Sequence, residues 1–391
     1  MYLKRTAILC LLGVSALATS AHAGGWNRGE ADTDILYEDG AYVMRGGAVY
    51  VVPHRKFDTV TVRTGPTTSA TIDSGDDSFS KSYWIPSLAF KFQATENLGC
   101  ALTYTQPFGA DAEYGYDAQR AAASWGNVPY GEKGFITNEY AATCDVSMDV
   151  GKGRIHFLGG VFVQDFSYTA VNEADNFGST QYGTLRLEDD SAFGYRFGVG
   201  YDIPEYALRA QLMYRSQVDH ETNSGSFDVQ DLGVLYYPAS GYGSLPQSVK
   251  LSLQTGVAPG WMVYGSVKWT DWSVMQALNY EINGGARQDV YNWQDGWTIT
   301  AGVAHAFSEK FGGTINVTWD KGVATGADIY SDTWTFGAGV SIKHGPGEWR
   351  LGGAVSYLTE GSQSLAKDAT FNATADGDWA YALSANYRIT F

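Results

Sequence analysis

The fold of this chain is decided by its last stretch, DWAYALSANYRITF, which runs from Asp378 to Phe391. From Trp379 onward every second residue is apolar, and the residues between them are small or polar. Because successive side chains of a β-strand point to opposite faces, this pattern predicts a strand with one apolar face. A strand that crosses a bilayer needs ~9–11 residues, apolar outward, with aromatic residues at both interfaces. The stretch is therefore predicted to be the closing strand of a transmembrane β-barrel.

The composition extends this interpretation to the whole chain of 391 residues. The chain contains 47 Gly, 26 Tyr, 18 Phe and 12 Trp but only 10 Pro, which favours an all-β protein. Beyond the N-terminal leader, no stretch approaches the ~18 consecutive apolar residues that a transmembrane helix requires. The net charge of −16 argues against nucleic acid as a partner, and it suits cation-bridged lipopolysaccharide or simple solubility.

The N-terminal region divides into two parts before the barrel begins. Residues 1–23 are expected to be a secretory signal peptide, because Lys4 and Arg5 precede an apolar run that ends near a small-x-small cleavage site. Residues 24–45 are polar and acidic and show no clean period. They are expected either to fray or to form a short plug, or hatch, at the periplasmic mouth. The barrel is expected to occupy residues 46–391.

The rest of the chain contains fourteen candidate strands, separated alternately by short turns and mostly longer connections. This alternation is typical of outer-membrane barrels, and an even number of strands returns both termini to the periplasm. The predicted fold is all-β, a fourteen-stranded antiparallel transmembrane β-barrel with a short N-terminal plug. The candidate strands are 46–62, 79–94, 97–112, 135–148, 154–171, 190–203, 206–220, 244–257, 261–279, 288–307, 311–322, 331–343, 348–360 and 378–391.

The inward faces of these strands carry basic residues, although the chain as a whole is acidic. One explanation is that they pair with inward acids such as Asp202 and Asp320. The functional alternative is that a few of them bind an anionic head group such as a carboxylate. Arg196, Lys250 and Lys268 are the candidates for this role.

The third candidate strand contains Gln106, Pro107, Phe108 and Gly109, which break its pattern. Proline cannot donate a hydrogen bond to the ladder, and a closed barrel has no edge where such a break is harmless. Either the strand ends near Thr105, or these four residues form an inward kink that opens a gap in the wall.

The connection 221–243 is unusually apolar for an exposed loop, and it contains Phe227, Leu232, Leu235 and Tyr236. An exposed apolar cluster at a barrel mouth often marks a contact site, so these four residues are candidates for binding a hydrophobic substrate. The alternative is that they pack loop against loop.

No chemistry-bearing motif was found elsewhere. Sequence motifs of hydrolases, metalloproteases and nucleotide-binding loops are absent, so no enzyme activity, catalytic residue, metal or cofactor is expected. Cys100 and Cys144 lie near the periplasmic ends of the third and fourth strands. They are expected either to form a disulfide or to remain as lipid-facing thiols.

The chain resembles the FadL/TodX family of outer-membrane transporters for long-chain fatty acids and other hydrophobic molecules. The resemblance implies a fourteen-stranded barrel, an N-terminal hatch, a groove made by outer loops at 172–189 and 221–243, and sideways exit at a kink in the third strand. Residues 24–45 depart from the family because they are short and lack its Asn-Pro-Ala element. The matching stretches are Gly47–Pro53, Trp84–Phe90, Tyr214–Val218, Leu245-Pro246, Trp269–Ser273 and the terminal Phe391.

These observations lead to one functional expectation and one alternative. The expected function is an outer-membrane channel of a Gram-negative bacterium that takes up hydrophobic molecules such as long-chain fatty acids, and the expected state is a monomer. The alternative is a general porin for small hydrophilic solutes, which would require an open polar lumen and polar loops.

Overall fold

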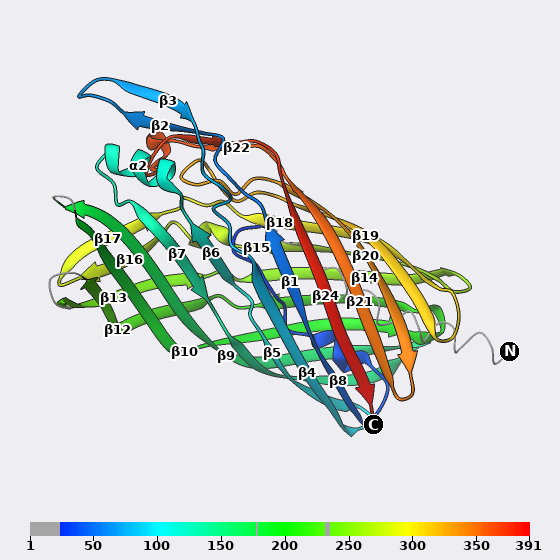
Figure 1. The fold of residues 1–391 in the computed structure, drawn as a ribbon. Helices are drawn as coiled ribbons and strands as arrows, with labels where there is room; N and C mark the ends of the chain where they lie inside the picture. Colours follow the sequence, from blue (N-terminus) through cyan, green and yellow to red (C-terminus); the bar gives the residue numbers. More distant parts are fainter. Residues whose placement is uncertain (1–23, 177–178, 231–234) are drawn as a thin grey trace.

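The computed structural model describes residues 24–176, 179–230 and 235–391, so the expected signal peptide lies outside the described residues. Its strands form a closed antiparallel barrel, because β1 pairs with β24 on one side and with β4 on the other (Figure 1). The barrel strands and their companions are β1 (Tyr42–Pro53), β4 (Tyr83–Thr95), β5 (Leu98–Thr105), β6 (Gly109–Glu113), β7 (Tyr130–Ile136), β8 (Glu139–Val150), β9 (Gly153–Asn176), β10 (Ser179–Ile203), β11 (Leu208–Arg215), β12 (Val218–Gln230), β13 (Leu235–Leu245), β14 (Ser248–Ala258), β15 (Trp261–Thr270), β16 (Ala277–Ile282), β17 (Gly285–Val290), β18 (Gly296–Ala306), β19 (Phe311–Asp320), β20 (Thr333–His344), β21 (Gly347–Leu358) and β24 (Asp378–Thr390).

The predicted count of fourteen barrel strands is confirmed. Six of them are interrupted, and each of these carries two labels: β5 with β6, β7 with β8, β11 with β12, β13 with β14, β15 with β16, and β17 with β18. The first strand begins at Tyr42, before the expected boundary at Gly46, so the last residues of the expected plug already belong to the barrel wall.

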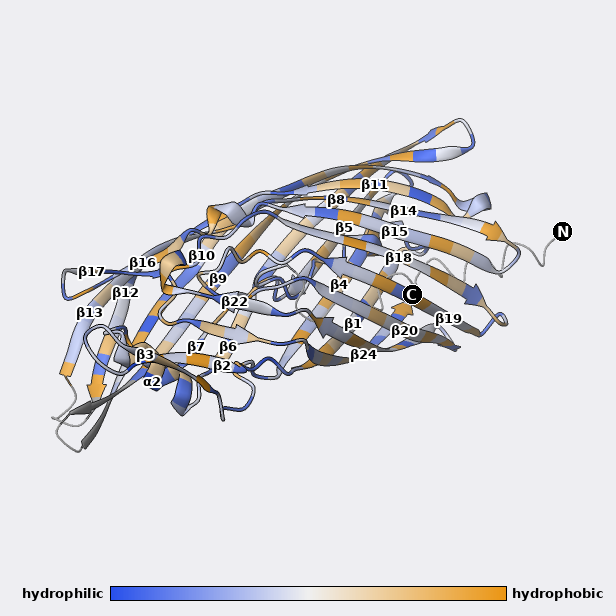
Figure 2. Cartoon of the chain, turned by 90° about the horizontal axis from the view of Figure 1, so that it is seen from above, coloured by the Kyte–Doolittle hydropathy of each residue, from blue (hydrophilic) through white to orange (hydrophobic). Residues whose placement is uncertain are grey.

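Alternating burial along the strands confirms which face meets the lipid. In β10, Phe193, Tyr195 and Phe197 are exposed on the outer surface, whereas Arg196 between them is buried inside. The same alternation of hydrophobic and hydrophilic residues recurs along the barrel in Figure 2. Among the helices of the described residues, none is long and apolar enough to cross a membrane.

A small cap covers one end of the barrel, opposite the end where the C-terminus lies (Figure 1). It consists of a four-stranded sheet and one α-helix, which pack around buried Phe57 and Phe371. The expected strand 46–62 was wrong in this region, because the barrel strand ends at Pro53 and the next strand belongs to the cap. The cap elements are β2 (Thr59–Arg63), β3 (Ser69–Asp73), β22 (Gly361–Gln363), β23 (Ala373–Ala375) and α2 (Tyr116–Ser124). The remaining 3₁₀ turns are η2 (Thr33–Tyr37), η3 (Pro204–Tyr206), η4 (Trp272–Val274) and η5 (Leu365–Lys367).

The expectation that 172–189 and 221–243 are loops was also wrong. These segments belong largely to the hairpins β9–β10 and β12–β13, which continue as paired strands. The alternation Ser226-Phe227-Asp228-Val229 is itself a strand pattern, but it lacks the long apolar face of a membrane strand. These paired strands lengthen the barrel wall.

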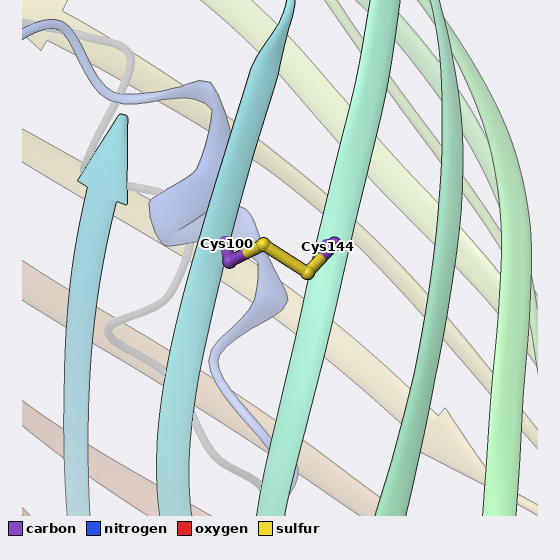
Figure 3. The surroundings of a disulfide bond; sticks show 2 residues. All are labelled: Cys100 and Cys144. Carbon is purple, nitrogen blue, oxygen red and sulfur yellow. A yellow bond between two sulfur atoms is a disulfide. The ribbon is translucent and has the colours of Figure 1, made fainter. Parts of the chain in front are cut away.

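Cys100 and Cys144 form a disulfide between β5 and β8, with their Cα atoms 4.0 Å apart (Figure 3). Leu102 and Val146 lie on the same face of these strands and are exposed, so the disulfide lies on the outer surface of the barrel. Of the two alternatives left by the sequence, the structure contains the disulfide. It links the third and fourth strands covalently.

Candidate functional site

Residues 24–41, called here the N-terminal segment, lie inside the barrel and are held there by ion pairs with the wall. Glu38 bonds to Arg45 and Arg388, and Arg350 lies 3.5 Å from the same carboxylate. Burial raises the pKa of Glu38, but these three arginines lower it more, to about 2. Because the folded pKa is depressed, the stabilisation is present above the ordinary pKa and is lost only as the pH falls towards 2.

Glu30 of the N-terminal segment bonds to two of the predicted basic site residues. Its carboxylate oxygens lie 2.6 Å from Nζ of Lys250 and 2.9 Å from Nζ of Lys268. Burial raises the pKa of Glu30, but the two lysines lower it more, so the pKa lies below its ordinary value. Both lysines therefore share one carboxylate of the N-terminal segment.

The third predicted base, Arg196, pairs with Glu139 at the start of β8. Arg215 lies 2.8 Å from the second oxygen of the same carboxylate, and Arg196 and Glu139 are buried. Each of the three bases predicted to bind a head group thus has an acidic partner already.

These three bases line one cavity of about 350 Å³ inside the barrel, called here the inner cavity. Residues 27–34 form one side of it, and Pro107 and Phe108 contribute to its wall. The structure therefore brings together the predicted bases and part of the predicted kink. It does not bring the residues of 221–243 to this place.

The third strand is interrupted where the sequence predicted, and it resumes afterwards. The alternative that it ends near Thr105 was wrong, because β6 continues the strand from Gly109 and pairs with β7. In the interruption, the carbonyl oxygens of Gln106 and Pro107 accept hydrogen bonds from backbone N–H groups of the N-terminal segment, each at 2.8 Å. The wall strand thus turns to pair with the segment inside the barrel.

A gap in the ladder lies between β4 and the third strand. Ladder pairing stops at Ser87 with Thr105 and reappears only as an isolated bridge of Ser80 with Ala112 in the described chain. Arg28 of the N-terminal segment lies at this gap, where its guanidinium stacks 4.0 Å from the ring of Tyr83. The gap is therefore occupied from inside the barrel.

The fourth strand is also interrupted, at Thr137 and Asn138, and the sequence analysis did not identify this break. Asn138 accepts a hydrogen bond from Nε2 of Gln106 at 3.1 Å across the two strands. The segment contains neither proline nor glycine, so it offered no local sequence signal.

A second cavity of about 350 Å³ lies beneath the cap and is called here the outer cavity. Its walls come from the cap, from β6 and β7, and from the connections 291–295, 321–332 and 364–372. No sequence pattern predicts this cavity, because its residues come from segments far apart in the chain. Its aromatic lining residues are Trp26, Phe57, Phe79, Tyr114, Tyr130, Phe135, Tyr168, Tyr291, Tyr330 and Phe371.

Trp26 separates the two cavities. It is 8% exposed, and its ring centroid lies 4.7 Å from that of Phe135 and 4.5 Å from that of Trp293. Its indole N–H donates to the hydroxyl of Tyr330 at 3.0 Å. The residues directly after Trp26 line the inner cavity, so this side chain lies at the boundary between the outer cavity and the inner cavity.

Phe227, Leu235 and Tyr236, the candidates from 221–243 that the structure describes, do not line either cavity. Phe227 packs at the edge of the aromatic cluster around Trp26, and Leu232 lies outside the described residues. Leu235 and Tyr236 belong to β13, where they pair with Val229 and Asp228 and are 44% and 68% exposed. Within the described parts of the chain, no three His, Cys, Asp or Glu side chains are grouped so that they could hold a metal ion.

Comparison with known proteins gives one family and several similar structures. The family model described as outer membrane protein transport protein (OMPP1/FadL/TodX) matches residues 36–312. A FadL homologue of Pseudomonas aeruginosa is 14% identical with a TM-score of 0.71, over 96% of this chain and 99% of that one. The toluene transporter TodX of Pseudomonas putida is 14% identical with a TM-score of 0.61, over 96% of each chain.

The CymD monoaromatic hydrocarbon channel is 10% identical with a TM-score of 0.61, over 95% of this chain and 99% of that one. At these identities the structural matches show a shared fold. No curated protein sequence matches the chain.

Proposed function

Because this chain belongs to the outer-membrane transport protein family OMPP1/FadL/TodX, we propose that it is a channel for hydrophobic compounds that enter at the cap. The observation that carries the proposal is the outer cavity, which is lined by ten aromatic side chains and which Trp26 closes towards the lumen. Transfer of a hydrocarbon from water into such a chamber is favourable by ~0.8 kcal/mol per buried CH₂ group. Capture therefore needs no energy source.

The route beyond the outer cavity follows from the charges of the inner cavity. A hydrocarbon that passes Trp26 meets ion pairs such as Glu30 with Lys250 and Lys268, which offer it no favourable contact. The gap between β4 and the third strand leads instead towards the lipid. We infer that the compound leaves sideways there, once the Arg28 side chain moves away from Tyr83.

A general porin is less well supported by this arrangement. A hydrophilic solute needs a continuous aqueous path along the barrel axis. Here the N-terminal segment crosses the lumen and is anchored through Glu30 and Glu38 to several inward bases. A carboxylate substrate such as a long-chain fatty acid would have to displace Glu30 or Glu139 before it could bind Lys250, Lys268 or Arg196.

A charge placed in the outer cavity should weaken capture. Phe79 lines this cavity and stacks on Phe57 with ring centroids 4.6 Å apart. We expect Phe79→Asp to reduce the affinity for butylbenzene by at least about tenfold, which corresponds to about 1.4 kcal/mol. Titration calorimetry on the purified protein in detergent measures this affinity. Tyr116→Asp is the matched control, because Tyr116 lies on α2, is exposed and does not line the cavity. Equal affinity in the wild type and Phe79→Asp would remove the outer cavity as the capture site.

The exposed residues of the β12–β13 hairpin should affect the rate of capture more than its equilibrium. Leu235 and Tyr236 are exposed and do not line the outer cavity. We therefore expect Leu235→Ser combined with Tyr236→Ser to slow butylbenzene uptake at low concentration, while its affinity in detergent stays unchanged. Stopped-flow quenching of tryptophan fluorescence gives the rate. A loss of affinity as large as the loss of rate would place these residues in the binding site itself.

A further inference from the structure

Most charged side chains of the outer cavity already have an ion-pair or hydrogen-bond partner of complementary charge. Those without an oppositely charged partner among the described residues are acids. The cavity wall contains two basic and four acidic side chains: Arg55, Lys133, Asp111, Asp289, Asp328 and Asp368. The guanidinium of Arg55 donates to Ser331 and to the carbonyl oxygens of Thr359 and Asp376. It is therefore not available to an anionic ligand.

Lys133 is also occupied. Its Nζ lies 2.7 Å from Oδ2 of Asp289, which accepts a further hydrogen bond from the hydroxyl of Tyr168 at 2.9 Å. The ammonium group lies 4.8 Å from the centre of the Tyr130 ring, which contributes to holding it in place. A ligand carboxylate would have to compete with an ion pair that is already hydrogen-bonded. Asp111 is likewise paired, with Arg28 at 2.6 Å.

Asp328 differs from these groups because the described ion pairs do not include it. Its two oxygens accept the indole N–H of Trp293 at 3.0 and 2.9 Å. A carboxylate offers about four acceptor positions, so most of its capacity remains for a ligand. Burial raises the pKa of Asp328 to about 7, and the hydrogen bond from Trp293 and the charge of Lys133 lower it less. A neighbouring cation would have kept this pKa low.

The aromatic ring that donates to this carboxylate belongs to a cluster of rings. The ring of Trp293, which donates to Asp328, lies 5.0 Å from the ring of Tyr330 and 5.5 Å from that of Tyr291. The faces of such rings attract cations, and their bodies accept apolar groups. A carboxylate beside clustered rings is the chemistry that recognises an ammonium group, and it also accepts a hydroxyl hydrogen.

We propose that the outer cavity selects amphiphiles whose polar end donates hydrogen bonds, an amine before an alcohol, and that Asp328 recognises this end. The inference rests on the proposed function, in which the outer cavity captures the compound. It assigns a substrate class to that cavity: an apolar or aromatic body with a donating head group. A carboxylate is the least favoured head group in this cavity.

Four ligands with one body test the proposal: 4-butylbenzylamine, 4-butylbenzyl alcohol, 4-butylbenzoate and butylbenzene. Their affinities for the purified full-length protein are measured by titration calorimetry at about pH 8, where Asp328 is ionised. The amine should bind at least about tenfold more tightly than the benzoate to the wild type. In Asp328→Asn the amine should lose about tenfold, and the benzoate should bind more tightly than it does to the wild type.

Asp368→Asn is the matched control, because Asp368 lines the same cavity but is exposed and bonds to Asn292. Its backbone has φ 71°, which asparagine accepts, so the substitution removes one charge without strain. The preference for the amine should persist in this variant. If Asp368→Asn abolishes the preference as fully as Asp328→Asn does, overall charge rather than Asp328 governs selection and the proposal is wrong.

Binding of butylbenzene, which has no polar head group, tests the proposed function separately from this inference. If butylbenzene binds but the benzoate binds as tightly as the amine, the capture site stands and the inference fails. If butylbenzene and all three polar ligands fail to bind, the capture site itself is wrong and the inference falls with it. The wild-type series decides the substrate class even if Asp328→Asn does not fold.

Discussion

Removal of residues 26–40 should convert the closed barrel into an open pore that prefers anions. This deletion removes most of the N-terminal segment and keeps every residue of β1. A barrel of fourteen strands is wide enough to leave an aqueous channel once nothing crosses its lumen. We expect the single-channel conductance in planar bilayers to rise by at least about tenfold.

The preference for anions follows from the partners that are lost. The deletion removes Glu30 and Glu38, which form ion pairs with Lys250, Lys268 and Arg388 in the intact protein. Lys250 and Lys268 then line water without their carboxylate partner, whereas Arg388 keeps Glu348 at 3.3 Å. Unpaired inward bases select anions. The reversal potential in a salt gradient measures the selectivity.

Deletion of residues 64–68, at the tip of the β2–β3 hairpin, is the control, since that turn lies in the cap sheet outside the barrel. It should leave the conductance low. Folding of both variants is checked by the heat-dependent shift in gel mobility. If the variant that lacks residues 26–40 keeps a low conductance, inward side chains of the strands, rather than the N-terminal segment, block the lumen. Cation selectivity would contradict the assignment of Lys250 and Lys268 to the lumen.

The sequence predicted the barrel because each strand repeats one local rule. Apolar and polar residues alternate along β24 and β10, and this pattern can be seen without knowing which residues lie nearby in space. It correctly predicted that Arg196 lies inside the barrel. The partners of the inward bases could not be found in this way. Asp202 bonds to His156 and Asp320 to Thr298, whereas the bases pair with other acids.

Two of those acids, Glu30 and Glu38, lie in a segment without a repeating pattern. Their pairing depends on how that segment threads the closed barrel, which no periodicity encodes. The outer cavity escaped prediction for a related reason. Phe79, Tyr291 and Phe371 each lie in an irregular stretch, and their proximity arises only when the cap folds over the barrel end. The interruption at Pro107 could be predicted because proline itself lacks the backbone N–H that a strand needs. The interruption at Asn138 could not, because asparagine does not break a strand by itself.

The proposed sideways exit depends on the bend at Pro107, and restoring a backbone donor there should reduce uptake. In Pro107→Val the new N–H group can pair across the wall, and valine favours a strand. We expect butylbenzene uptake into vesicles to fall by about tenfold as the gap between β4 and the third strand closes. Affinity at the outer cavity should be unchanged, because Pro107 does not line it.

Pro107 is a better site for this substitution than Gly109, because Gly109 also contacts Arg28 of the N-terminal segment. A Cβ atom on Gly109 would lie 2.7 Å from the Arg28 guanidinium, so a larger residue there would also displace the N-terminal segment. Pro107→Val leaves that contact intact and changes only the wall. Pro346→Val, in the short turn between β20 and β21, removes a proline at the end of the barrel opposite the cap and should not alter uptake.

Transport along the barrel axis and sideways exit through the wall should respond differently to Pro107→Val. A solute that runs along the barrel axis never uses the wall, so its permeation should not depend on whether the third strand is continuous. A compound that leaves through the wall must cross the gap that Arg28 occupies beside Tyr83. Breaking backbone hydrogen bonds next to lipid costs several kcal/mol per exposed group, so a continuous ladder would not open readily for it. Wild-type uptake in Pro107→Val, with a crystal structure showing an unbroken third strand, would therefore rule out sideways exit at this place.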